Sequence, residues 1–176
     1  MTKVLSTTNL IIVILAVMVF VAFFLPWAHI EAPAIGAVSK ILVGKAQANI
    51  TSISGFDVPI MANGPDARLA MSIIQIFSPG IKDADKKSFL IWGVPLLALA
   101  FAAAAIFLSK NKFVNLAIAV IGIAIFIVGV YKINTTDLNK LVLNVRIGLG
   151  LWLVFLGYLG MGIAALINFL QLSKKK

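Results

Sequence analysis

Four long apolar runs without one charged residue or histidine constrain this chain more than any other feature. They cover residues 10–27, 89–108, 113–131 and 147–170, which is 18 to 24 residues each. An α-helix of about 20 residues crosses a hydrocarbon core of about 30 Å. Lipid offers no partner for backbone N–H and C=O groups, and the runs lack the alternation of barrel strands, so each run must be helical. The sequence therefore predicts an all-α integral membrane protein built as a four-transmembrane-helix bundle.

The composition agrees with this class. Hydrophobic residues make up 61% of the chain and charged residues 12%, whereas soluble domains average about 45–50% and about 25%. The formal net charge of +9 would suggest nucleic acid in a soluble protein. Here the basic residues lie beside apolar runs, and no basic face alternates with stacking aromatic side chains. We therefore expect the lipid bilayer and not nucleic acid as a partner.

The distribution of charge predicts the orientation. The short segments at the two ends and between the second and third runs hold six lysines and no acid: Lys3, Lys110, Lys112, Lys174, Lys175 and Lys176. All six acids lie in segments 28–88 and 132–146. Because cytoplasmic loops are enriched in Lys and Arg, both termini are expected in the cytoplasm, and loop 28–88 outside a plasma or inner membrane. Four aromatic residues then form a belt at the outer interface: Trp27, Trp92, Tyr131 and Trp152.

The first run is interpreted as a retained anchor rather than a cleaved signal peptide. It has 18 residues, and the apolar core of a signal peptide has about 7–15. The stretch Ala32-Pro33-Ala34 is poorly placed for cleavage and contains a proline.

Loop 28–88 has 61 residues, more than an unstructured connection normally has. Ala37–Val43 is compatible with a strand, and Ile50–Ile60 has apolar residues at alternate positions. Gly44 and Gly55 allow a turn or bulge. We expect a short β-hairpin that packs over the helix ends.

One amphipathic helix is also expected in this loop, over residues 66–78. Leu69, Ile73, Ile76 and Phe77 recur at helical spacing, and Pro79-Gly80 ends the pattern. Three interpretations stay open: the apolar side caps the loop's own core, lies on the outer leaflet, or docks a partner.

Small residues recur within the apolar runs, and the fourth run carries Gly157 and Gly160 among others. Small residues let helices approach closely in lipid. They indicate packing within the chain, and an additional seam between chains is compatible with it. Two amides, Asn115 and Asn168, are expected near the cytoplasmic ends, where they can reach headgroups.

The apolar runs contain no carboxylate pair, no Ser–His arrangement and no metal-ligand spacing. We therefore expect no enzyme, no cofactor and no metal. His29 and Glu31 are too few for a metal site, and interfacial hydrogen bonding explains His29 better. A membrane enzyme using His29, Asp57 and Asp66 is the least favoured hypothesis. The chain has no cysteine for disulfides or thiol chemistry.

Two N-glycosylation patterns lie on the predicted outer side, at Asn49 and Asn134. They would matter only in a eukaryotic secretory pathway.

In outline the predicted topology resembles that of claudin-like tetraspan proteins, which have a large first outer loop. Those proteins carry a cysteine pair in this loop and this chain has none, so the resemblance covers topology only. The Leu25-Pro26-Trp27 exit from the first run, followed by Ser54-Gly55, is similar to many small bacterial tetraspan proteins. That likeness implies no activity.

The sequence favours a non-catalytic multi-pass membrane protein that acts by association. It would be an accessory or structural subunit of a larger membrane assembly, or a tetraspan that associates with copies of itself. The candidate interaction residues are Trp27, Phe56, Ile73, Phe77, Gly157 and Gly160. The alternative is a small oligomeric channel or transporter component.

Overall fold

The computed structural model describes residues 6–30, 52–62, 88–135 and 145–174. The elements follow in the order α1 (Thr7–Ala22), β1 (Pro26–Ile30), β2 (Ser52–Ser54), α3 (Asp57–Ala62), the 3-10 helix η2 (Ser88–Trp92), α6 (Gly93–Phe107), α7 (Lys112–Thr135), β3 (Val145–Ile147) and α8 (Leu149–Lys174). The expected strand at 37–43 and the expected helix at 66–78 lie outside the described residues.

Three helical segments are long and apolar enough to cross a membrane. They are Phe89–Phe107, which joins η2 to α6, then Lys112–Thr135 and Leu149–Lys174. They coincide within a few residues with three of the four apolar runs. Their length and composition indicate an integral membrane protein.

The first apolar run forms a shorter helix than the sequence predicts. Helix α1 has 16 residues, which corresponds to about 24 Å. It ends at Ala22, and Leu25 donates its N–H to the Ala22 carbonyl at 3.2 Å in a tight turn. The reason is Pro26, because the residue before a proline is driven out of the α region. Pro26 begins strand β1, so Trp27 lies in a strand and not at the end of a helix.

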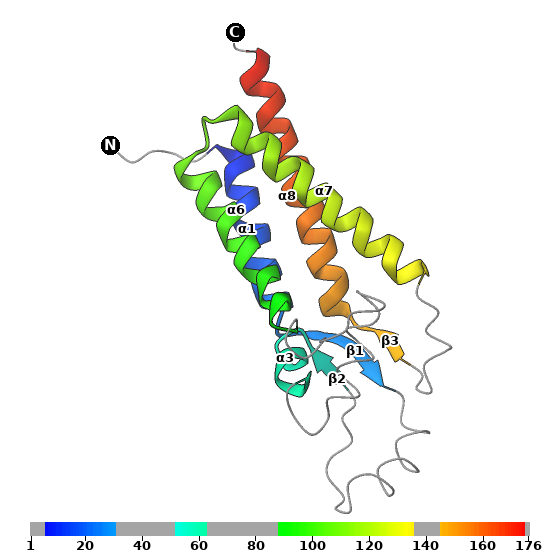
Figure 1. Ribbon diagram of the computed structural model, residues 1–176. Helices are drawn as coiled ribbons and strands as arrows, with labels where there is room; N and C mark the ends of the chain where they lie inside the picture. Colours follow the sequence, from blue (N-terminus) through cyan, green and yellow to red (C-terminus); the bar gives the residue numbers. More distant parts are fainter. Residues whose placement is uncertain (1–5, 31–51, 63–87, 136–144, 175–176) are drawn as a thin grey trace, which may run out of the picture.

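The four long helices pack against one another unequally. Buried residues of all four long helices share one core, in which α8 packs against α1 and α7, and α1 packs against α6. Although a tight turn joins α6 to α7, the two helices diverge from that turn (Figure 1). Two glycines allow the close α7–α8 contact, since a Cβ on Gly122 would lie 3.1 Å from the Gly162 Cα.

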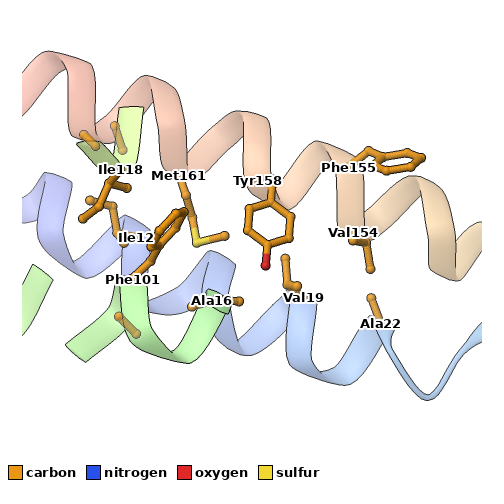
Figure 2. Packing of buried hydrophobic residues seen from close by; sticks show 14 of the residues in the cluster. Ile12, Ala16, Val19, Ala22, Phe101, Ile118, Val154, Phe155, Tyr158 and Met161 are labelled. Carbon is orange, nitrogen blue, oxygen red and sulfur yellow. The ribbon is translucent and has the colours of Figure 1, made fainter. Parts of the chain in front are cut away.

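The shared core lies where the four long helices meet. Tyr158 and Met161 of α8 point toward α1 and α6, and Phe101 lies beside Met161 and Ile12 (Figure 2). The Tyr158 hydroxyl donates a hydrogen bond to the Val94 carbonyl of α6. Its ring meets Phe101 edge-on, with the centroids 6.0 Å apart. Tyr158 therefore joins α8 to α6 by a polar and an aromatic contact.

The described residues also form a small antiparallel sheet, which takes in strands outside the short β-hairpin that we expect in the first loop. The strand order is β2-β1-β3. Strand β1 is the exit from α1, β2 comes from the first long loop, and β3 precedes α8. The expected alternation over 50–60 gives a strand only at Ser52–Ser54, because α3 begins three residues later at Asp57.

The sheet lies at one end of the helices, which we call the sheet end (Figure 1). The opposite end, the terminal end, is where α1 and α7 begin and α8 finishes. Segments from both predicted outer loops thus meet at the sheet end.

Candidate functional site

Five aromatic rings contact one another beyond the C-terminal end of α1, and we call them the exit cluster: Phe23, Phe24, Trp27, Phe56 and Trp92. Phe23 lies at the centre, with its ring centroid 5.7 Å from that of Trp27 and 5.2 Å from that of Trp92. Phe56 follows β2 and lies 5.3 Å from Trp92 and 5.5 Å from Phe24. Edge-on and tilted pairs at these distances are favourable. The cluster therefore joins the α1 exit, the first long loop and η2.

Trp27 is the member of the exit cluster that lies in the sheet, and its side chain is buried. It is 4% exposed, and its indole Nε1–H donates to the Ala22 carbonyl at 3.0 Å. That carbonyl belongs to the last turn of α1, where carbonyl groups lack helical partners. The indole thus closes the end of the helix. The register shifts between Pro26 and Ala28, and this irregularity lets the consecutive Trp27 and Ala28 both be buried.

Gly55 lies directly against the exit cluster. A Cβ at this position would be 2.6 Å from Cζ2 of Trp27 and 2.7 Å from Cδ2 of Phe23. Only a glycine backbone fits there without movement of the rings. The neighbouring Ser54 and Asp57 form a reciprocal cap, in which the Asp57 carboxylate accepts from the Ser54 N–H at 2.9 Å and the Ser54 hydroxyl accepts from the Asp57 N–H at 3.3 Å. This cap fixes the turn from β2 into α3.

A second pair of glycines lets the start of α8 approach the exit from α1. The Gly148 N–H donates to the Trp27 carbonyl at 2.7 Å. A Cβ on Gly148 would overlap the Pro26 carbonyl, and one on Gly150 would lie 2.7 Å from the Leu25 carbonyl oxygen. Backbone, not a mobile side chain, is the neighbour in both cases. The exit of α1 and the entry of α8 are therefore held in direct contact.

The two faces of the sheet differ in character. Ala28 pairs with Ile53 and Ile147, and Ala28 and Ile53 are buried. His29 pairs with Ser52 on one side and Arg146 on the other, and these three side chains are exposed. Directly opposite residues in an antiparallel pair lie on the same face. The sheet therefore packs one face on the helix ends and displays a polar row on the other.

The candidate interaction residues fall into three groups. Trp27 and Phe56 are part of the exit cluster. Gly157 and Gly160 face α1, since a Cβ on Gly157 would overlap Val19 and one on Gly160 would lie 2.7 Å from Leu15 Cδ1. These four residues have contacts within the chain, and a role toward a partner stays a prediction for them. Ile73 and Phe77 lie outside the described residues, as does Glu31.

The sequence predicted only a turn or bulge at Gly55, and it placed Gly148 and Gly150 only among the small residues of the fourth apolar run. A signal was present, because a glycine beside a strand often marks close approach of another segment. The segment that approaches could not be identified from spacing, since Gly148 follows Trp27 by more than a hundred residues.

The terminal end contains a buried polar cluster. Asn168 of α8 donates its Nδ2–H to Asn9 Oδ1 at 2.6 Å, and the Thr8 hydroxyl donates to Asn168 Oδ1. Asn9 is 5% and Asn168 6% exposed. Asn115 is 2% exposed and donates to the carbonyls of Ser109 and Asn111. The expectation that Asn115 and Asn168 reach headgroups is wrong, because both amides bind protein groups.

Within the described ranges, every buried side-chain nitrogen and oxygen has a hydrogen-bond partner. In the same ranges no three His, Cys, Asp or Glu residues form a group able to hold a metal ion. The arrangement at the sheet end can hold two loops on the helix ends and display one polar sheet face. No known protein family, curated protein or solved structure matches this chain.

Proposed function

We propose that this chain is a non-catalytic multi-pass membrane protein that acts by association. It serves as an accessory or structural subunit of a larger membrane assembly, or associates with copies of itself. In the proposed topology α1 crosses the membrane together with the three longer helical segments. Both termini then lie in the cytoplasm, and the sheet end lies outside a plasma or inner membrane, as the charge distribution favours.

The observation that carries this proposal is the rigid attachment of the sheet to the helix ends. Strands β1, β2 and β3 and helix α3 are held by the exit cluster, by the Ser54–Asp57 cap and by the backbone contact at Gly148. We call these four elements the platform. Recognition gains affinity when a binding surface is already ordered before the partner arrives. A chain that only occupies lipid has no need for such a platform.

The displayed surface supports the same proposal. The polar row of Ser52, His29 and Arg146 crosses all three strands, and Ile60 is exposed on α3. A displayed polar row can supply the direct hydrogen bonds that protein–protein contacts contain.

Cysteine crosslinking tests the proposal cleanly, because the chain has no native cysteine. The variants Ser52→Cys and Ile60→Cys place a thiol on the platform, and Lys110→Cys places one at the terminal end as a matched control. In native membranes treated with a membrane-permeant crosslinker, the platform thiols should give one adduct of defined mass. That adduct should persist when expression is lowered about tenfold. Platform thiols that crosslink no more than Lys110→Cys, together with a monomer in mild detergent, would contradict the proposal.

The same variants test the topology. A membrane-impermeant maleimide added to intact cells should label Ser52→Cys and leave Lys110→Cys unlabelled until the membrane is opened. Labelling of Lys110→Cys in intact cells would reverse the proposed orientation.

A further inference from the structure

We propose that the terminal end binds the headgroups of anionic phospholipids through Lys110, Lys112 and Lys174. This goes beyond association with protein partners, and it depends only on the chain lying in a bilayer. Three observations carry it: the charge of this end, the position of Lys112 beside an exposed ring, and the fixed geometry of the turn.

The terminal end is positively charged without any compensating acid. Lys110 and Lys174 are exposed and Lys112 is half-buried. Lys175 and Lys176 follow Lys174 directly in the sequence, and no acidic residue occurs in 1–30, 86–136 or 138–176. A cluster of lysines next to a membrane-spanning helix attracts anionic lipid.

Lys112 is held at the edge of the apolar surface. Its ammonium nitrogen lies 5.1 Å from the centroid of the Phe113 ring, a cation–π distance. Phe113 is 70% exposed, and Phe107 and Leu108 on the other side of the turn are also exposed. Exposed rings and aliphatic groups of this kind belong in hydrocarbon. The ammonium beside them therefore lies at the depth where lipid phosphates begin.

The turn that carries the two lysines has a fixed backbone. Asn111 accepts from the Phe113 N–H at 3.0 Å and donates its own N–H to the Leu108 carbonyl at 2.9 Å. The Asn115 amide closes the turn from inside by bonding to the Ser109 and Asn111 carbonyls at 3.1 and 2.9 Å. Lys110 and Lys112 are thus displayed from an ordered loop, which lowers the entropy lost on binding.

The apolar neighbours favour a lipid over a soluble anion. A free phosphate would contact the ammonium groups alone, whereas a phospholipid also covers the exposed ring of Phe113 with its acyl chains. These apolar neighbours therefore favour a headgroup whose acyl chains lie against the exposed Phe113 of α7.

Native mass spectrometry of the detergent-solubilised full chain provides the test. The protein is mixed with equimolar phosphatidylglycerol and phosphatidylcholine that carry identical acyl chains. The wild-type chain should retain more phosphatidylglycerol. In Lys110→Gln/Lys112→Gln this preference should fall by about fivefold for each lysine removed. Lys110→Arg/Lys112→Arg keeps the charge and should keep the preference.

The control pair is Lys132→Gln/Lys140→Gln, which removes two charges from segment 132–146. Its preference should match the wild type. An equal loss in both pairs would overturn the proposal, because it would show an effect of net charge alone. Displacement of phosphatidylglycerol by millimolar inorganic phosphate would also overturn it, since the site would then recognise a soluble anion.

Discussion

The two ends of the molecule fix the helices by different means. At the sheet end, aromatic rings and backbone groups pack directly against glycines. The Trp27 ring contacts Gly55, and the backbone of Pro26 and Trp27 contacts Gly148. At the terminal end, the amides of Asn9 and Asn168 join α1 to α8 through a side-chain hydrogen bond. The contacts at the sheet end depend on close steric fit against glycines, whereas those at the terminal end depend on hydrogen bonds between polar side chains.

This difference predicts unequal sensitivity to substitution. A steric contact with backbone cannot relax, so a single added methyl group forces elements apart. A side-chain hydrogen bond between membrane helices is worth only about 0.6 kcal/mol on average, because the unfolded chain in the membrane also finds partners. The sheet end should therefore contribute more to stability than the terminal end.

The largest effect is expected for Trp27→Ala. Removing a buried tryptophan leaves a cavity and should lower the free energy of unfolding by about 3–5 kcal/mol. Trp27→Phe keeps a ring but loses the hydrogen bond to the Ala22 carbonyl, and should cost about 1 kcal/mol. Unfolding in mixed micelles by titration with a denaturing detergent measures both. Trp152→Ala is the control, because that indole is 38% exposed; an equal loss in the control would disprove a special role for the exit cluster.

Gly148→Ala should have the next largest effect, about 3 kcal/mol. The new methyl group overlaps the Pro26 carbonyl, so β1 and the start of α8 must separate. The matched control is Gly93→Ala, because a Cβ there has no neighbour within 4 Å. Unfolding in the same micelles should show no loss in that control. Equal stability of the two variants would mean that the close approach at Gly148 does not contribute to the free energy of unfolding.

The helices were predictable from sequence, whereas the sheet was predictable only in part, through the expected strand in 50–60. A charge-free apolar run in lipid can satisfy its backbone hydrogen bonds only as a helix. Three of the runs accordingly form helices within a few residues of their predicted bounds. The early end of α1 could also have been predicted from local sequence, because Pro26 restricts the backbone of Leu25. It was missed because the apolar run continues to Trp27 without a charged residue. The strands have three to five residues each, which is too short for a periodic pattern.

The candidate site was predictable only in part, for a related reason. Trp27 and Phe56 could be chosen as large apolar residues at or beyond the end of the first apolar run. The packing of Trp27 against Gly55 depends on pairing between strands that are distant in sequence. The same holds for the polar cluster, because Asn168 stands out in an apolar run while its partner Asn9 lies 159 residues away.

The smallest effect in the comparison is expected for Asn168→Leu. The substitution keeps the arrangement of heavy atoms but leaves the Asn9 amide without its partner and removes the acceptor of the Thr8 hydroxyl. The loss should be about 1 kcal/mol, close to the range of hydrogen bonds between membrane helices. A double-mutant cycle with Asn9→Leu separates the pair energy from the cost of each orphaned group. A coupling larger than the Gly148→Ala effect would reverse the comparison, because polar pairing and not steric fit would then dominate the stability of this fold.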